Sequence, residues 1–560
     1  MKKLKKQTQK KLFISAILTL CMVCVGARYF DASQTAFNPV PTPTNPSIVT
    51  GSNQDNTHPE TASSSKKSGS STSNNSIKTE RDYSSAPRQQ MIRNKVAVEY
   101  EYRALLTAND PGYSSSWILQ KVNAPAAWNI STGNNQTVVA DIDSGFALNH
   151  EDLAANWRTN SREQGTTTSG DRCWTGTPQN KQSNNCDDDN NGYVDDWRGW
   201  NFTNATNNPQ AGQTNVSGGG VAHGTETAGL IGAVGNNGKG IATINWSTKI
   251  MPLQALDDSG TGYTSDITAA IYYAVDNGAN VINMSLGGSQ FDQALDDAIT
   301  YAYQHGVVVV AAAGNCGTGA ESGCDPSKPG AMSYPALDNH VIAVGATTQT
   351  DARASFSSYG AGLDVVAPGA GTITSTGWTS GNATTLYATN LNGTSFASPQ
   401  VASLAALIKS IRPSTSVDDV TALILGTATK VSGLGGQFYN TEYGHGLVNA
   451  AAALTVAQGL NSTASNTPIL LQTGGPNSEH SLLGATTTGS GCTTLSSTYC
   501  SIWLKDTRTG FDRYLPYSLT NGSGQAGWTW GAAVIGSGSW SVRAVQGQAV
   551  STTPYLMNGK

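Results

Sequence analysis

The pattern of hydrophobic and polar positions changes along the chain and divides it into distinct stretches. Between residues 111 and 459, short β-branched apolar runs alternate with Ala-rich stretches that carry apolar residues at helical spacing. The predicted strands are 137–142, 249–253, 280–284, 307–312 and 341–344, and the predicted helices are 264–277, 290–305 and 395–411. Strands that alternate with helices form parallel sheets covered on both faces. We therefore expect a three-layer α/β domain with a central parallel sheet at 111–459.

The N-terminal stretch 1–27 has the pattern of a secretory signal peptide. Six lysines precede the apolar run 12–26, and Val25-Gly26-Ala27 offers a small-residue cleavage site. The run is too short for a membrane span, so we expect a secreted protein with no transmembrane span. Cys21 and Cys24 leave a lipid-anchored cell-surface protein as the alternative, although large residues precede both cysteines.

Two further stretches flank the predicted α/β domain. Residues 28–110 are rich in Ser, Thr, Asn, Pro and Gln, so they bury too little apolar surface to offset the entropy of ordering. We interpret them as a low-complexity pro-segment or linker. Residues 465–560 carry short alternating runs, such as 501–504 and 540–545, between Gly-rich turns. They predict a small β-rich C-terminal domain.

Composition and charge narrow the class of protein. The chain has 560 residues, which is too long for one core, and only 13% of them are charged. The net charge is −5, and loss of residues 1–27 leaves 27 basic against 38 acidic side chains, a net charge of −11. Without a basic stripe, nucleic acid is not an expected partner. We expect a monomer.

Six cysteines lie outside the leader, and an even number in an exported chain indicates disulfides. Six cysteines allow fifteen pairings, but their spacing forms three close couples. The expected disulfides are Cys173–Cys186, Cys316–Cys324 and Cys492–Cys500. A metal site is the alternative, but no CxxC motif or Cys/His cluster supports it.

Three segments carry candidate chemistry. Asp143 ends the apolar run 138–143, where open α/β sheets build their sites. His223 opens the motif HGTETAG, and Ser395 stands at the head of an Ala-rich helix, where the helix dipole favours negative charge. Each segment alone is commonly a turn, a structural histidine or a helix cap. Together, in the order Asp, His, Ser, they predict a catalytic triad.

These segments resemble the signatures of the subtilisin family of serine peptidases from about Tyr113 to Ala452. Further ordered matches are VINMSLG at 281–287, AAAGN at 311–315, SFSSYG at 355–360, VVAPG at 365–369 and NGTSFASPQVA at 392–402. By this resemblance Asp143, His223 and Ser395 match the triad, and Asn315 matches the oxyanion-hole amide. The residues that match the substrate-pairing strands and the walls of the primary specificity pocket are Ser285, Leu286, Gly287, Ala313 and Gly314.

The resemblance implies a subtilisin-like fold and a secreted serine endopeptidase that hydrolyses peptide bonds in proteins through an acyl-enzyme. The alternative is a surface adhesion or binding protein on an inactive protease scaffold. The presence of the triad residues and Asn315 argues against it. Glu226 stands where the family commonly has a second histidine. Gln400 stands where the family often has a histidine. Residues 28–110 also look too polar for the folded inhibitory pro-domain of many members.

The stretch 187–196 spaces oxygen ligands at alternate positions, with Gly192 at the sixth place for a sharp turn. This is the spacing of a calcium loop, although Arg198 stands where the final Glu is usual. A solvated acidic turn is the alternative, but five Asp within ten residues repel one another without a cation. We therefore expect structural Ca²⁺. The predicted ligands are Asp187, Asp189, Asn191, the carbonyl of Tyr193, Asp195 and Asp196.

Overall fold

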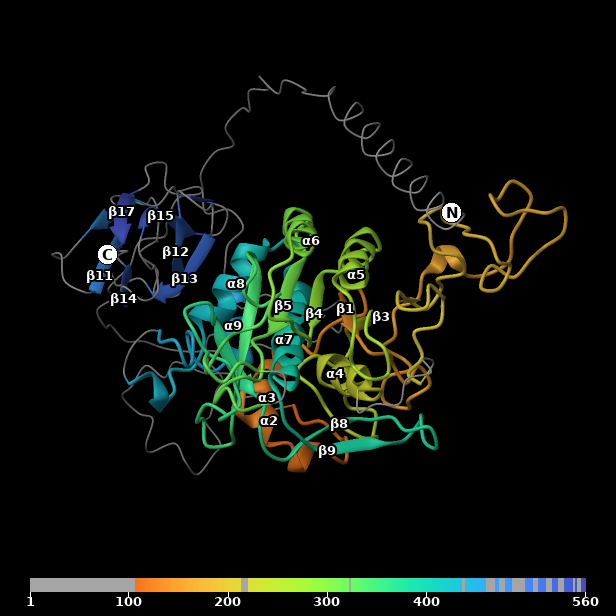
Figure 1. Ribbon diagram of the computed structural model, residues 1–560, viewed down its shortest axis with the longest axis horizontal. Coiled ribbons are helices and arrows are strands. Elements are labelled where there is room, and N and C mark those ends of the chain that lie inside the picture. The colour runs from red at the N-terminus through yellow and green to blue at the C-terminus, as the bar shows by residue number, and fades with distance from the viewer. Residues whose placement is uncertain are drawn as a thin grey trace, which may run out of the picture. The chain divides into compact units, whose positions relative to one another are not determined.

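The computed structural model describes residues 106–212, 220–321, 324–435 and 439–459, together with the C-terminal strands given below (Figure 1). The predicted signal peptide and nearly all of the predicted pro-segment lie outside the described residues. Within the part of the chain that is described, no helix combines the length and apolarity that a membrane crossing requires.

A seven-stranded parallel sheet forms the centre of the α/β domain, in the order β2-β3-β1-β4-β5-β6-β7. Its strands are β1 (Val138–Asp143), β2 (Trp200–Asn201), β3 (Lys249–Gln254), β4 (Val281–Met284), β5 (Val308–Ala312), β6 (Val341–Thr347) and β7 (Val365–Pro368). The chain leaves β1 toward β3 on one side and later returns to β4 on the other. Such a switch in strand order opens a crevice at the carboxyl ends of the strands.

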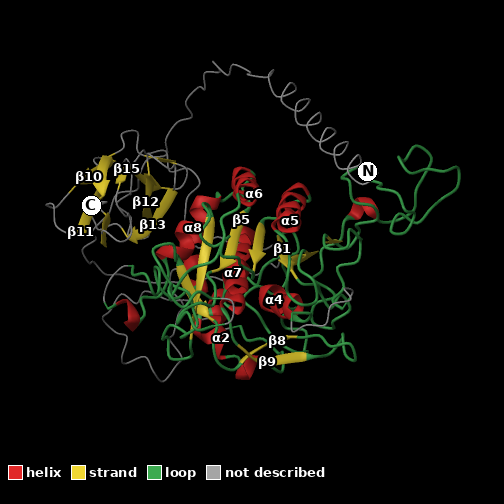
Figure 2. Ribbon diagram, in the orientation of Figure 1, coloured by secondary structure: helices red, strands yellow, loops and turns green. Residues whose placement is uncertain are grey.

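Helices cover both faces of this sheet (Figure 2). The helices are α2 (Trp117–Lys121), α3 (Ala124–Trp128), α4 (His223–Gly232), α5 (Thr264–Asp276), α6 (Gln293–Gln304), α7 (Ser398–Ile411), α8 (Val417–Gly426) and α9 (Ala450–Gly459). Val139 joins a buried cluster with residues of α4, α7, α8 and α9. Its neighbours Ala140 and Ile142 face the other way, into a cluster with α5 and α6. Alternate side chains of β1 thus pack into the hydrophobic cores on opposite faces of the sheet. The predicted three-layer architecture is confirmed.

Capping explains where several helices begin. Asp292 caps α6 by accepting from the backbone N–H groups of Ala294 and Leu295, so this helix begins at 293 rather than at 290. The predicted helix 395–411 is divided in two. A 3₁₀ turn, η4 (Thr394–Phe396), carries Ser395, and α7 follows with a proline in its first turn.

Shorter elements complete the domain. They are a hairpin of β8 (Ile373–Thr376) and β9 (Tyr387–Leu391) and the 3₁₀ turns η2 (Tyr113–Ser115), η3 (Ser161–Glu163) and η5 (Ser432–Leu434).

The C-terminal stretch contains antiparallel strands, in agreement with its predicted β-rich character. They are β10 (Ile469–Gln472), β11 (Glu479–Ala485), β12 (Tyr499–Asp506), β13 (Asp512–Leu519), β14 (Ala526–Gly531), β15 (Gly538–Gln546), β16 (Ala549–Val550) and β17 (Tyr555–Gly559). One sheet has the order β10-β11-β14; a second has the order β13-β12-β15-β16, with β17 also paired to β15.

Candidate active site

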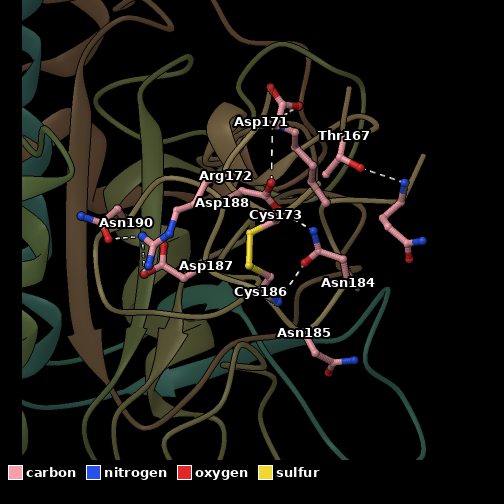
Figure 3. Close-up of a disulfide and its surroundings, with 12 residues drawn as sticks. Thr167, Asp171, Arg172, Cys173, Asn184, Asn185, Cys186, Asp187, Asp188 and Asn190 are labelled. Atoms are coloured by element: carbon pink, nitrogen blue, oxygen red, sulfur yellow. Dashed lines mark hydrogen bonds and ion pairs between the residues drawn. A yellow bond between two sulfur atoms is a disulfide. The ribbon is translucent and has the colours of Figure 1, made fainter. Parts of the chain in front are cut away.

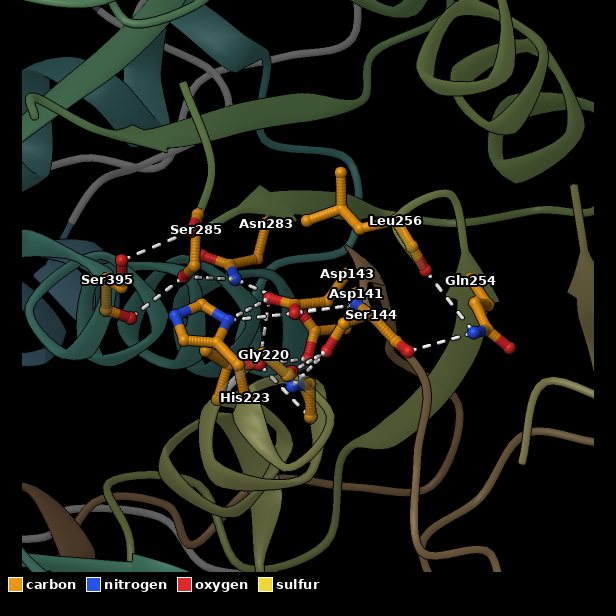
Figure 4. Close-up of polar contacts among 12 residues, drawn as sticks. Asp141, Asp143, Ser144, Gly220, His223, Gln254, Leu256, Asn283, Ser285 and Ser395 are labelled. Atoms are coloured by element: carbon orange, nitrogen blue, oxygen red, sulfur yellow. Dashed lines mark hydrogen bonds and ion pairs between the residues drawn. The ribbon is translucent and has the colours of Figure 1, made fainter. Parts of the chain in front are cut away.

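The carboxylate of Asp143 and the imidazole of His223 form a direct pair at the carboxyl end of β1 (Figure 4). Nδ1 of His223, the first residue of α4, lies 2.8 Å from Oδ1 and 3.0 Å from Oδ2 of Asp143. The backbone N–H of Ser144 also donates to Oδ1 of Asp143, at 2.7 Å. Asp143 is fully buried, whereas a quarter of the His223 side chain is exposed. The carboxylate therefore holds the ring by one nitrogen.

The surroundings of His223 make it a strong base. Burial by itself lowers the pKa of the imidazole, but the charge of Asp143 and the hydrogen bond to it raise the pKa to about 9. A carboxylate in this position stabilises the imidazolium that forms when the ring accepts a proton.

Ser395 joins this pair from the turn η4. Its hydroxyl donates to the carbonyl of Ser285 at 3.2 Å, while the Ser285 hydroxyl donates to the Ser395 carbonyl at 2.9 Å. The ring of the next residue, Phe396, lies 5.7 Å from the imidazole of His223. The fold thus brings the three predicted triad residues from three distant segments to one edge of the sheet.

The amide of Asn315, which follows β5, is fixed beside Ser395. Its Oδ1 accepts from the backbone N–H of Thr394 at 2.9 Å and from the Thr394 hydroxyl at 3.0 Å, so its Nδ2 remains the donor. A Cβ placed on Gly393 would lie 3.6 Å from the backbone N of Ser395 and 3.7 Å from Nδ2 of Asn315. Two N–H donors therefore flank one small space. Gly393 has a φ of +155°, which other residues rarely adopt.

The two segments predicted to line the substrate site converge on one side chain. A Cβ placed on Gly287 would lie 2.6 Å from Cβ of Ser333, and one placed on Gly314 would lie 2.6 Å from its Oγ. Gly288, at the end of the first segment, exchanges backbone hydrogen bonds with Tyr334. Ser333 therefore occupies the space where the predicted pocket walls meet.

Comparison with known proteins identifies the family. The sequence profile of the subtilase family matches residues 134–446, more than half of the chain. This chain belongs to the subtilase family. It is 35% identical to thermitase from Thermoactinomyces vulgaris over 62% of this chain and 99% of that protein. It is 34% identical to a thermophilic serine proteinase from Bacillus sp. (strain AK1) over 65% of this chain and 74% of that protein.

Subtilisin DY from Bacillus licheniformis is 43% identical over 42% of this subtilase and 78% of that protein. The predicted resemblance is confirmed, and the chain is a subtilisin-like serine endopeptidase. The two positions that depart from the family pattern lie near the site. Burial raises the pKa of Glu226 on α4. Gln400 donates to the carbonyls of Pro368 and Phe396, both at 2.7 Å, and so holds the turn that carries Ser395.

The acidic loop of this subtilase gathers only part of its predicted ligand set. Carboxylate oxygens of Asp187, Asp189 and Glu163 all lie within 4.8 Å of one another. Asp195 accepts from the backbone N–H of Asn185 at 3.1 Å. The carboxylate of Asp196 accepts from the side chains of Asn160, Asn191 and Tyr273 at 2.6–2.7 Å. The other predicted oxygen donors are Asn191, whose Oδ1 accepts from the Tyr193 N–H at 2.8 Å, and the Tyr193 carbonyl.

Two of the three expected disulfides are present. Cys173–Cys186 closes the segment that leads into the acidic loop, and Asp187 and Asp188 lie beside it (Figure 3). Cys316–Cys324 follows directly on Asn315. The expected pair Cys492–Cys500 lies outside the residues whose side chains are described.

Two side chains of interest were not singled out from the sequence. Glu163 lies far upstream of the acidic loop, and no spacing connects it to Asp187. Asp141 is fully buried two residues before Asp143. The period of two in a strand was a usable signal, because it places both carboxyls on the same face of β1.

Proposed function

We propose that this subtilase is a secreted serine endopeptidase that cleaves proteins through an acyl-enzyme on Ser395, with His223 as general base and Asp143 as its orienting carboxylate. The observation that carries the proposal is that both oxygens of the Asp143 carboxylate approach Nδ1 of His223, which leaves Nε2 available to accept a proton. Secretion rests on the leader pattern at 1–27. Protein substrates and a monomeric state belong to the same proposal.

The reaction begins when the Ser395 hydroxyl gives up its hydrogen bond to the Ser285 carbonyl and donates to Nε2 of His223 instead. His223 takes the hydroxyl proton as Oγ attacks the scissile carbonyl, and Asp143 stabilises the imidazolium. His223 then returns the proton to the leaving amine. Water, activated by the same base, releases the acyl group and restores Ser395.

A serine-directed phosphonate provides the primary test. It should inactivate the folded protein with one equivalent of label on Ser395, because a triad serine attacks such reagents in proportion to its activation. Folded protein that takes up no label would instead support the alternative of an adhesion protein on an inactive scaffold.

The oxyanion that develops on the scissile carbonyl has two candidate donors, Nδ2 of Asn315 and the backbone N–H of Ser395. Asn315→Ala should lower kcat by about 10²–10³ with little change in KM, because the donor acts mainly on the transition state. Steady-state kinetics on a peptide anilide measure both constants. Asn135→Ala, an exposed residue before the amino end of β1, serves as the control. A loss confined to KM would assign Asn315 to ground-state binding instead.

The segments Ser285–Gly287 and Ala313–Gly314 would pair with the substrate backbone and wall the pocket for the residue before the scissile bond. Gly287 and Gly314, and Ser333 beside them, carry no charge, so this pocket would favour uncharged side chains.

We also propose that the acidic loop binds structural Ca²⁺. Its charged ligands would be Asp187, Asp189 and Glu163, with Asn191, the Tyr193 carbonyl, Asp195 and Asp196 as further predicted donors. Glu163 supports the fit, because it is fully buried and its Oε2 has no hydrogen-bond partner, while Oε1 accepts from the Asp189 N–H at 3.0 Å. Hard oxygen donors of this kind suit Ca²⁺. Bound there, the ion would neutralise the loop and hold it in place.

Chelation should therefore lower the thermal midpoint. A cation at a hundredfold excess over its Kd stabilises the native state by about 2.7 kcal/mol, which corresponds to a shift on the order of 5 °C. Scanning calorimetry with EGTA or with added Ca²⁺ measures the shift. Glu163→Gln should shrink this difference, whereas Glu442→Gln, an exposed carboxylate beside Arg353, should leave it as in wild type. An equal shift in all three proteins would place the calcium elsewhere.

A further inference from the structure

A second carboxyl group, that of Asp141, lies buried beside the pair of Asp143 and His223 (Figure 4). Asp141 and Asp143 share the face of β1 that packs against α4. Oδ1 of Asp141 accepts from Nδ2 of Asn283 at 2.9 Å, and its Oδ2 is hydrogen-bonded to Oγ1 of Thr227 at 2.9 Å. No step of the proposed reaction uses this group.

The surroundings of Asp141 favour its protonated form. Two fully buried carboxyls on one strand face cannot both be charged without a cation for each, and the cation that forms here, His223, is bound to Asp143. Burial, together with the charge of Asp143, accordingly raises the pKa of Asp141, although hydrogen bonds from Asn283 and Thr227 oppose the rise. In this protonated form, Asp141 is a neutral acid that must donate a hydrogen bond.

The position of this proton follows from the orientation of Asn283. Its Oδ1 accepts from the hydroxyl of Ser398 at 2.7 Å, and its Nδ2 lies 3.1 Å from the hydroxyl oxygen of Ser285. The donor end of the amide thus faces Oδ1 of Asp141. The proton of Asp141 therefore belongs on Oδ2, directed at Oγ1 of Thr227.

Thr227 then has its own proton free to donate. Within reach of Oγ1 are the carbonyl of Gly224, at 3.1 Å, and Oδ2 of Asp143, at 3.4 Å. When Asp141 loses its proton, the same hydroxyl must turn to Asp141 instead. The protonation state of Asp141 thus decides whether Thr227 is available to Asp143.

We propose that Asp141 is a positioning residue of the active site, which as a neutral acid donates to Thr227 and keeps the Thr227 hydroxyl available to the carboxylate that orients His223. This inference rests on the proposed function, since it concerns the base of that triad.

The same acid is connected to the nucleophile segment. Asn283, held by Asp141, contacts the hydroxyl of Ser285, which in turn donates to the carbonyl of Ser395. Asp141 therefore connects through Thr227 to the carboxylate that orients the base, and through Asn283 and Ser285 to the turn that carries the nucleophile.

Few titratable groups surround Asp141, so its effect on the pH dependence of kcat/KM can be interpreted. The titratable groups that act on it are Asp143 on β1 and His223 on α4. The side chains that face it from α4 and β4, Thr227 and Asn283, carry no charge, and α7 contributes only the hydroxyl of Ser398 to this network. A negative charge on Asp141 would raise the pKa of His223, so the position of the His223 titration reports whether Asp141 is charged.

Two substitutions in the full-length enzyme separate hydrogen bonding from charge. Asp141→Asn keeps an acceptor toward Asn283 and a donor toward Thr227 but never ionises, whereas Asp141→Leu neither donates nor accepts. The acid limb of the kcat/KM profile should stay within about 0.3 pH unit of wild type in Asp141→Asn, because a neutral amide replaces a neutral acid and the charge around His223 does not change. The plateau kcat should be about tenfold higher in Asp141→Asn than in Asp141→Leu, with similar KM values.

Several results would overturn the inference. If the limb moves down in Asp141→Asn, Asp141 is charged in the working enzyme and cannot be the donor to Thr227. If both variants have equal plateau kcat, the hydrogen bond to Thr227 contributes nothing. Should the Asp141 variants fail to fold, Thr227→Val against Thr227→Ser repeats the comparison, and the valine variant should have the lower kcat. A wild-type protein that neither hydrolyses peptides nor takes up the phosphonate would instead refute the proposed function itself.

Discussion

Ser395→Ala is expected to lower kcat for peptide hydrolysis by about 10⁶, because no other group near His223 can form the acyl-enzyme. The residual rate would come from substrate binding and from the donors of the oxyanion hole. The Ser395 hydroxyl makes a single hydrogen bond, to the Ser285 carbonyl, so its removal leaves the surrounding turn in place. Initial rates on a peptide anilide at high enzyme concentration measure the effect.

The control for this variant lies in the helix that follows. Ser410→Ala removes a hydroxyl from α7 that donates to the Leu407 carbonyl, and it should leave kcat within about twofold of wild type. The thermal midpoint of Ser395→Ala should equal that of the wild-type protein. Residual activity above one percent of wild type would mean that another residue attacks the substrate.

Asp143→Asn is expected to lower kcat by about 10⁴, the second largest effect. The carboxylate accepts from both the Ser144 N–H and Nδ1 of His223. An amide accepts through one atom only, so its NH₂ group would face Nδ1 and force the imidazole into the tautomer that carries its proton on Nε2. That tautomer cannot accept the hydroxyl proton of Ser395.

The pH profile distinguishes this explanation from a loss of structure. In Asp143→Asn the pKa of His223 should fall from about 9, because the charge and the hydrogen bond that raise it are gone. Asp351→Asn, which removes the charge of a partly buried partner of Lys121, is the matched control and should behave as wild type. Near-normal turnover in Asp143→Asn would assign the orienting role to a different carboxylate.

The sequence was sufficient to predict those parts of the site that depend on local pattern. Asp143 follows a buried strand, and Ser395 precedes an apolar helix, so each was placed correctly near an element end. The order of the three segments then connected them. The 3₁₀ turn at Ser395 was not predictable from helical spacing, because a turn and the first residues of a helix share the same apolar periodicity.

Contacts between distant segments were the part that sequence pattern did not provide. Glu163 meets Asp187 and Asp189 only because η3 folds back on the acidic loop. The contact of Asp141 with Asn283 likewise exists only because β4 pairs with β1. Periodicity reports which face a residue occupies, but it does not report which neighbour meets it there.

The distance along the chain between the proposed catalytic segments affects how the enzyme folds. His223 is separated from Asp143 by 80 residues, and the bond between Ser395 and Ser285 spans 110. Contacts of such long range form late and slowly during folding. No molecule can cleave a peptide until nearly the whole sheet has closed, yet every chain that is still open exposes cleavable segments to the molecules that finished first. The yield of refolded enzyme should therefore fall as protein concentration rises, and Ser395→Ala should escape that loss.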